Sequence, residues 1–321
     1  MITKHYSYIF ISLITAFIFQ TYGLSVKVLS EHQLLLFSVV ENQIIHTGTD
    51  AYIRKVTHGN SLYILKQIND SSIDEQFLLI NDCIASTIGF ESGVPVNEVL
   101  FIPYNAGSHL KLYPERAATL HCIVPGQDLE SVLPEILPAN FSLHQRVINH
   151  SSVWQKKYPM SENQQGLSKL IIESMCCHTD LPLIAAFDCF VGNSDRSNPN
   201  LFYDAQTDSF YGIDQAAAFS KKLPSLALDR LNELMTMEYF DECRLATLDS
   251  LRRYQNMLRK LSDDVKPCAI IQSMKDLAFN LCPHALSNSE VEARTQYHSI
   301  MIAQNYLHTA ELLRILDQIL H

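Results

Sequence analysis

The pattern of apolar residues changes near residue 130, and this change constrains the fold more than any other feature. Between residues 24 and 130 the chain contains short extended runs, such as SLYILKQI at 61–68, and HGN at 58–60 predicts a tight turn between two of them. One longer stretch, 74–90, instead carries apolar residues at helical spacing. The first part of the chain therefore predicts a sheet accompanied by a helix.

After residue 130 the pattern predicts helices. The stretches concerned are 142–158, 165–178, 181–192, 226–240, 242–263 and 290–320. Ser287 and Glu290 predict a capping box at the start of the last one. We therefore predict an α+β fold with two lobes, a sheet-rich N-lobe at 24–130 and a helical C-lobe at 131–321, joined near Val124–Gly126. A cleft between two such lobes is a usual place for a ligand.

Composition narrows the choice of partners. The 321 residues are 47% hydrophobic and include only 10 glycines and 12 prolines, which is typical of a globular chain without long disordered tracts. The net charge is −10, from 24 Lys and Arg against 34 Asp and Glu, and this balance disfavours nucleic acid as a partner. An anionic ligand therefore needs a local basic patch, and we expect the chain to be a monomer.

The cysteines and the N-terminus bear on where the chain is found. Its eight cysteines include no CxxC pair and lie mostly in apolar runs, which favours reduced thiols over an oxidised framework. Residues 8–19 form an apolar stretch of signal-peptide length, so residues 1–23 predict a signal peptide or a membrane anchor, with a buried first element of the domain as the alternative. Localisation stays open between secretion, membrane association and the cytoplasm.

Isolated acids and amides stand at the ends of apolar elements in two stretches. FVGNSDRSNPNLFYD at 190–204 contains Asp195 and Asn200, and YGIDQAAAF at 211–219 contains Asp214. Asp195 can accept a proton from an attacking hydroxyl, and the oxygens of Asn200 and Asp214 are ligands of the kind that Mg²⁺ prefers. The alternative for the first stretch is an Asx-turn loop that caps the following strand.

A candidate cation for phosphate precedes these stretches. Lys66 lies inside the predicted strand between apolar neighbours, and the alternative is a lysine that snorkels at a sheet edge. Glu75 and Asp82 share one face of the following helix; either can pair with Lys66, and either can be a solvent-facing charge. We favour Glu75 as the partner. A cation, two oxygen ligands and a carboxylate are the groups that phosphoryl transfer requires.

Four stretches, in this order, resemble the atypical kinases of the phosphatidylinositol 3-/4-kinase superfamily. They are GTDAYIRKVTHGNSLYILKQ, ATLHCIVPGQDL, FDCFVGNSDRSNPNLFYD and YGIDQAAAF. The likeness is strongest to type II phosphatidylinositol 4-kinases, and HipA-like and secretory-pathway kinases are related families. It spans residues 45–225 and implies a bilobal atypical protein/lipid kinase-like fold that uses ATP and Mg²⁺.

The resemblance implies roles at the nucleotide. Gly48 and Thr49 look like the turn that holds the phosphates, although this loop has few glycines, and Lys66 looks like the ATP-binding lysine. The backbone that meets adenine would be a hinge, formed by Ile123, Val124 and Gly126. These positions would make up the cofactor site, together with the acid that pairs with Lys66.

The resemblance also implies roles in the reaction. Asp195 looks like the catalytic acid/base, and Asn200 and Asp214 look like the Mg²⁺ ligands. Asp188 matches an aspartate that supports the catalytic loop in the family. Ala216 replaces a glycine of the lipid kinases, so the segment after Asp214 is expected to be stiffer. Because no reacting group is missing, we expect an active enzyme.

Three hypotheses remain for what the site acts on. In the lipid kinases the segment after the metal aspartate contacts inositol phosphates, and Lys221 and Lys222 suit that role, with Arg196 as a further substrate contact; a solvated lysine pair is the alternative. The first hypothesis is therefore a kinase for an inositol lipid at a membrane surface. The second is a Ser/Thr protein kinase, and the third is a nucleotide-binding pseudokinase scaffold without turnover.

Overall fold

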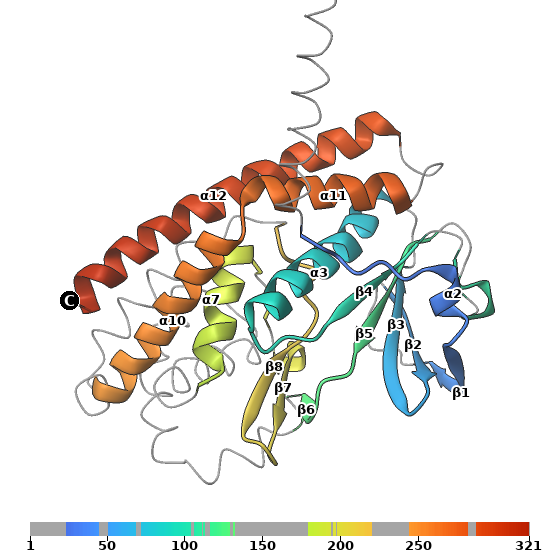
Figure 1. Cartoon of the computed structure of the whole chain (residues 1–321), viewed down its shortest axis with the longest axis horizontal. Coiled ribbons are helices and arrows are strands. Elements are labelled where there is room, and N and C mark those ends of the chain that lie inside the picture. Colours follow the sequence, from blue (N-terminus) through green and yellow to red (C-terminus); the bar gives the residue numbers. More distant parts are fainter. Residues whose placement is uncertain are drawn as a thin grey trace, which may run out of the picture.

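The computed structural model describes only part of the chain. The described residues are 24–44, 51–68, 72–103, 106–110, 112, 116–128, 131, 179–193, 195–196, 198–219, 244–281 and 287–320. The predicted signal or anchor segment at 1–23 and the predicted helices at 142–158, 165–178 and 226–240 lie outside them. Within the described residues the predicted α+β fold is confirmed, with strands dominating before residue 130 and helices after it (Figure 1).

The larger sheet is antiparallel, with five strands in the order β1-β2-β3-β5-β4. Its strands are β1 (Ser38–Ile44), β2 (Ala51–His58), β3 (Ser61–Ile68), β4 (Val99–Ile102) and β5 (Ala118–Cys122). His58 pairs with Ser61, and Gly59 between them has a φ of 58°, which glycine adopts without strain. This geometry confirms the predicted tight turn at 58–60.

The segment before β1 corrects one expectation. We predicted one helix in the first part of the chain, at 74–90, but a second, short helix, α2 (Glu31–Leu34), precedes β1. Ser30 and Gln33 form a capping box at its start, with Gln33 N–H donating to Ser30 Oγ and Ser30 N–H donating to Gln33 Oε1. This local signal outweighs the strand-like composition of the segment.

A second sheet lies beside the helical part and contains three antiparallel strands, β6 (Gln127–Asp128), β7 (Leu201–Asp204) and β8 (Ser209–Gly212). Ile123–Gly126 connects β5 of the first sheet to β6 of the second. Gly126 has a φ of 88°, and a Cβ added there would lie 2.2 Å from the carbonyl oxygen of Tyr203. Only glycine fits this crossing between the sheets.

The helices are α3 (Ile73–Ser92), α7 (Leu181–Val191), α10 (Arg244–Asp264), α11 (Pro267–Leu281) and α12 (Asn288–Leu320). The predicted capping box of α12 is confirmed, because Ser287 and Glu290 exchange hydrogen bonds between each side chain and the other's backbone N–H. Helix α11 was not predicted. Its buried Ile270, Met274 and Leu277 follow a helical spacing that was available in the sequence.

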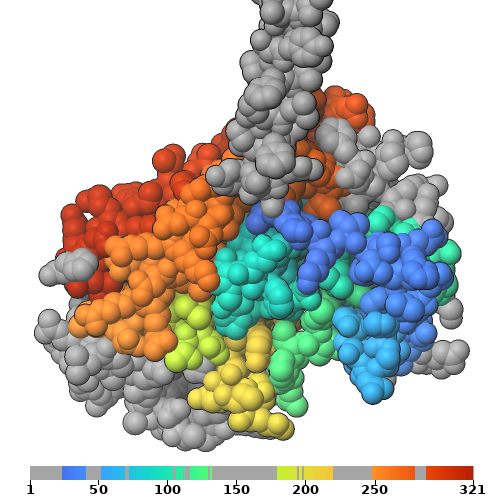
Figure 2. All heavy atoms as spheres, in the orientation of Figure 1, coloured from blue at the N-terminus to red at the C-terminus, as the bar shows by residue number. Residues whose placement is uncertain are grey.

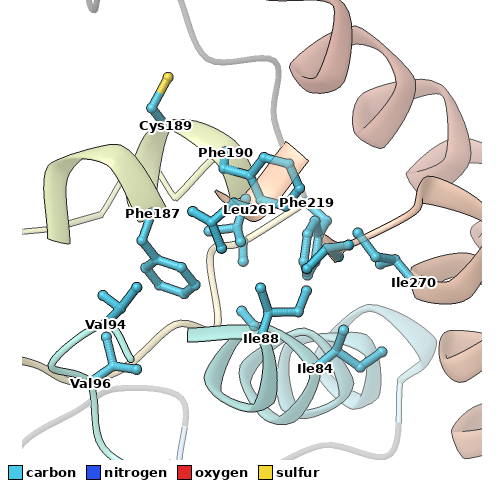
Figure 3. Packing of buried hydrophobic residues seen from close by; sticks show 14 of the residues in the cluster. Ile84, Ile88, Val94, Val96, Phe187, Cys189, Phe190, Phe219, Leu261 and Ile270 are labelled. Carbon is cyan, nitrogen blue, oxygen red and sulfur yellow. The ribbon is translucent and has the colours of Figure 1, made fainter. Parts of the chain in front are cut away.

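The main hydrophobic core extends across the boundary that we predicted at residue 130. One cluster of buried side chains contains Ile84 and Ile88 of α3, Phe187 of α7, Leu261 of α10 and Ile270 of α11 (Figure 3). Figure 2 shows the surface of α3, in cyan, between the orange C-terminal part and the blue N-terminal part of the chain. Helix α3 therefore belongs to the core of both lobes and fixes their relative position.

A buried histidine ties α12 to this core. His298 is fully buried, its ring stacks on Phe77 of α3 with centroids 5.2 Å apart, and Nδ1 donates to the carbonyl oxygen of Phe219 at 2.9 Å. Burial lowers the pKa of His298 to about 4, and the nearby Arg294 charge acts in the same direction. The ring is therefore neutral in the folded protein at pH 7.

This histidine gives a pH-dependent stability prediction. Between the unfolded pKa of about 6.5 and the folded pKa of about 4, the unfolded chain binds a proton at His298 that the folded chain does not, so this residue costs stability as the pH falls. At pH 7 we expect wild type to be more stable than His298→Asn. This difference in the free energy of unfolding should shrink by on the order of 3 kcal/mol when the pH falls from 7 to 4. Denaturant unfolding at both pH values measures this, and an equal loss at the two would contradict it.

Candidate active site

Lys66 meets two carboxylates that come from distant parts of the chain. Its Nζ lies 3.0 Å from Oδ1 of Asp214 and 4.0 Å from Oδ2 of Asp82. Burial acts to lower the pKa of Lys66, but the charges of Asp214 and Asp82 outweigh it and raise the pKa above its ordinary value. Lys66 is therefore an ammonium group held inside the site rather than a lysine snorkelling at a sheet edge.

The acid on α3 that lies near Lys66 is Asp82, not Glu75. We favoured Glu75, but that residue lies in the first turn of α3, where its backbone N–H donates to the capping Ser72 Oγ. Asp82 lies further along the helix, is fully buried, and accepts a hydrogen bond from the backbone N–H of Gln215 at 2.9 Å. Burial raises the pKa of Asp82 to about 7, against the opposing charge of Lys66.

His121 is a buried member of the site that the sequence did not indicate. Cross-strand pairing places Lys66 opposite Thr119, and Thr119 Oγ1 lies 2.8 Å from His121 Nε2. The amide Nδ2 of Asn97 faces His121 Nδ1 at 3.3 Å, so Nδ1 accepts and Nε2 carries the proton. Burial and the charge of Lys66 lower the pKa of His121 to about 3, which keeps the ring neutral.

Asp214 follows β8 and presents its carboxylate to the open side of the site. Its φ is 55°, a left-handed conformation that aspartate tolerates better than most residues. Burial acts to raise its pKa, but Lys66 lowers it below the ordinary value, so the group is ionised. Because 39% of the side chain is exposed, a ligand can reach the carboxylate.

The loop before β7 brings Asp195 and Asn200 to the same place. Asn200 Nδ2 donates to the backbone oxygen of Asp195 at 2.9 Å, and Asn193 Oδ1 accepts from the Asp195 N–H at 3.1 Å. The backbone oxygen of Asn200 accepts from Ile213 N–H at 3.0 Å, which sets Asn200 beside the residue that precedes Asp214. The Asp195 charge also contributes to the raised pKa of Lys66. Lys66, Asp195, Asn200 and Asp214 therefore converge on one region.

Arg196 is an internal residue, and the predicted substrate contact finds no support in its position. Its guanidinium is 5% exposed and pairs with the Asp188 carboxylate through Nε at 3.0 Å and Nη2 at 2.9 Å. Nη1 donates to the backbone oxygens of Asn200 and Ile213. Asp188 thus holds Arg196, and Arg196 binds the backbone both at Asn200 and at Ile213, the residue before Asp214. A Cβ added at Gly212 would lie 3.0 Å from the guanidinium carbon, so a side chain there would require Arg196 to shift by a few tenths of an ångström.

The remaining predicted positions fall into two groups. Ile123 and Gly126 are exposed and Val124 is half-buried, so the backbone between the two sheets is accessible to a ligand. The predicted phosphate turn at Gly48 and Thr49 and the predicted substrate lysines Lys221 and Lys222 lie outside the described residues.

The oxygens of Asp214 and Asn200 suit Mg²⁺ that is also bound by water and phosphate, rather than a metal ion held by protein side chains alone. Among the described residues, no group of three or more His, Cys, Asp or Glu side chains could hold an ion. Asp214 and Asn200 instead supply a carboxylate and an amide, and Mg²⁺ is commonly held by one or two such oxygens together with water and substrate phosphates. The residues present therefore fit Mg²⁺ in a complex with a nucleotide. In the described part of the chain, no helix has the length and apolar character of a membrane span.

Comparisons with known proteins add little to this geometry. No family model matches the chain, and no curated protein matches it. Among solved structures, the Helicobacter pylori proinflammatory kinase CtkA is 11% identical at a TM-score of 0.47, covering 86% of this chain and 96% of its own. Shewanella oneidensis HipA, solved with HipB and operator DNA, is 12% identical at a TM-score of 0.43, covering 86% of this chain and 68% of its own.

A third solved structure is an aminoglycoside phosphotransferase from Alicyclobacillus acidocaldarius, 11% identical at a TM-score of 0.30, covering 90% of this chain and 97% of its own. Similarities of this size carry no argument about function. In this chain, Lys66 of the larger sheet and Asp214, which follows the last strand of the smaller sheet, lie 3.0 Å apart.

Proposed function

We propose that the chain is an ATP- and Mg²⁺-dependent phosphotransferase. The observation that carries the proposal is the 3.0 Å contact between Lys66 and Asp214, two residues 148 positions apart, beside the loop that holds Asp195 and Asn200. Phosphoryl transfer depends mainly on positioning and on neutralising charge, and it needs few groups. The site supplies such a set. It contains a lysine, two metal ligands (a carboxylate and an amide) and a second carboxylate.

Each residue has a chemical role in this proposal. Lys66 binds the phosphates of ATP, and Asp214 and Asn200 would hold Mg²⁺, which neutralises the charge of the phosphates when bound. Asp195 accepts the proton of the acceptor hydroxyl. The hydroxyl oxygen then forms a bond to the γ-phosphorus while the bond to the β–γ bridging oxygen breaks, and ADP leaves with that electron pair.

The acceptor that we propose is an inositol lipid headgroup. The support for it is the resemblance of the four stretches to phosphatidylinositol 3-/4-kinases and the basic pair Lys221 and Lys222, which follows the metal aspartate in the chain. Asp195 is exposed, so a headgroup presented by a membrane has access to it. The alternative acceptor is a protein hydroxyl, and labelling of protein instead of lipid in the experiment below would favour it.

The test is transfer from labelled ATP. The full chain with Mg²⁺ is given phosphoinositide vesicles and, separately, a protein mixture. We expect labelled lipid from the wild type and none from Lys66→Ala, because phosphate and metal ligation act as a unit. The double change Lys221→Glu/Lys222→Glu should abolish lipid labelling, whereas Arg252→Glu/Arg253→Glu, the same change of charge on the exposed side of α10, should not.

Each of the other outcomes would indicate a different function for this chain. Labelled protein without labelled lipid would replace the lipid acceptor and keep the phosphotransferase. If the chain binds ATP but gives no labelled product with any substrate, and Asp195→Ala behaves like the wild type, the chain is a nucleotide-binding scaffold. That result would contradict the proposed phosphotransferase.

A further inference from the structure

Gln215, the residue after Asp214, makes more connections than its place in the sequence suggests. Its side chain is fully buried. The backbone N–H donates to Asp82 Oδ1 at 2.9 Å, and Oε1 accepts from Arg196 Nη2 at 3.1 Å. Nε2 donates to Asn97 Oδ1 at 3.1 Å. One residue therefore contacts α3, the loop of Asp195 and the segment that leads into β4.

Asn97 carries these connections on to the larger sheet. Its Nδ2 faces His121 Nδ1 at 3.3 Å, and its backbone oxygen accepts from Ser86 Oγ of α3. Its backbone N–H donates to the carbonyl oxygen of Gly212 at 3.1 Å. Asn97 is thereby fixed from three directions, so its Oδ1 is a rigid partner for Gln215.

On the other side, Arg196 carries the connections to the proposed catalytic loop. Its guanidinium joins Gln215 Oε1, the Asp188 carboxylate and the backbone oxygen of Asn200. Moving Gln215 out of its position would leave Arg196, Asn97 and Asp82 with unsatisfied buried groups. Because such groups carry the full cost of lost solvation, the arrangement has one strongly preferred state.

We propose that Gln215 is a positioning residue that sets Asp214, Asp82 and the loop of Asp195 and Asn200 in their reactive arrangement. The inference rests on the proposed phosphotransferase function. Small displacements of reacting groups cost much more rate than binding, since the transition state demands closer alignment than the bound substrate does. Loss of the Gln215 side chain therefore lowers kcat rather than raising KM for ATP.

The experiment compares two buried glutamines. Gln215→Met keeps the side-chain length and the backbone N–H that donates to Asp82, and removes the side-chain hydrogen bonds to Arg196 and Asn97. Gln255→Met is the matched control, because Gln255 is 4% exposed and its Nε2 donates to Asp317 at 2.8 Å, on the α10–α12 side away from the site. We expect Gln215→Met to lower kcat per folded molecule by about 30-fold or more, with KM for ATP within about threefold, and Gln255→Met to leave both within about twofold.

A double-mutant cycle tests the contact itself. If Gln215 acts through Asn97, the loss of kcat in Gln215→Met/Asn97→Ala is smaller than the product of the two single losses. For the pair Gln215→Met and Gln255→Met, in contrast, the loss of kcat in the double variant should equal the product of the two single losses. Losses that multiply in both pairs, or an unchanged kcat in Gln215→Met, would overturn the proposal.

Hydrogen exchange separates this inference from the proposed function, because it requires no turnover. We expect Gln215→Met to speed amide exchange in the peptides that contain residues 193–200 and 80–86, and Gln255→Met to leave them unchanged. A wild type without phosphotransfer, combined with this exchange pattern, would end the phosphotransferase and keep the positioning role of Gln215. Unchanged exchange in those peptides would overturn the positioning role even in an active enzyme.

Discussion

Asp214→Asn is expected to lower the rate of phosphotransfer by about a thousandfold or more. The substitution removes the negative charge of Asp214, which lies 3.0 Å from Lys66 Nζ. It also removes one of the carboxylate oxygens proposed to hold Mg²⁺. It leaves the backbone undisturbed, because asparagine tolerates the left-handed φ of 55°. Initial rates at saturating ATP over a range of Mg²⁺ concentrations measure the loss.

Asp208 offers a matched control for this change. It has a similar φ, 50°, and lies on the exposed turn between β7 and β8. Asp208→Asn is expected to retain the wild-type rate within about twofold, as is usual for surface changes. A rate for Asp214→Asn within about tenfold of wild type would remove this residue from the metal site.

Asp195→Asn is expected to lower kcat by about a hundredfold to ten-thousandfold while the affinity for nucleotide is retained. Asparagine has the shape of aspartate but cannot accept the proton of the acceptor hydroxyl. The two shorter contacts of Asp195 with Asn193 and Asn200 involve its backbone and are retained, and the substitution affects only the 3.5 Å contact between the carboxylate and Asn200 Nδ2.

Two measurements on Asp195→Asn check this account. Single-turnover labelling gives the rate of the chemical step, and binding of a fluorescent ATP analogue gives the affinity. Loss of both together would indicate a folding defect or a role in nucleotide binding, and a retained chemical step would exclude Asp195 as the proton acceptor.

Local signals in the sequence predicted the elements that carry the site. The extended run SLYILKQI and the turn at 58–60 define β3, and the helical spacing of 74–90 defines α3. The short polar stretches around Asp195 and Asp214 stand between apolar elements. Such features depend only on neighbouring residues, so they can be read from one sequence.

The partner of Lys66 could not be predicted in the same way. Glu75 and Asp82 lie on one face of α3, and the choice between them depends on how far the helix is shifted along the sheet. Packing of α3 against α10 and α11 sets that shift. This packing joins residues far apart in the chain, so the helical pattern of α3 alone does not contain it.

The internal polar connections were also beyond the reach of local patterns. Arg196 was expected to contact substrate, but its side chain is 5% exposed and pairs with Asp188. Gln215 and His121 belong to no spacing or motif in the sequence that indicates a role. Their roles come from hydrogen bonds such as Gln215 to Asn97, 118 positions apart, which only the folded chain brings together.

A crystal structure of the full chain with Mn²⁺ and a non-hydrolysable ATP analogue tests most directly whether these groups serve one bound nucleotide. We expect an anomalous peak within bonding distance of both Asp214 and Asn200, the triphosphate within hydrogen-bonding distance of Lys66 Nζ, and the γ-phosphate facing Asp195. A nucleotide bound elsewhere, or a metal that none of these oxygens touches, would contradict the account.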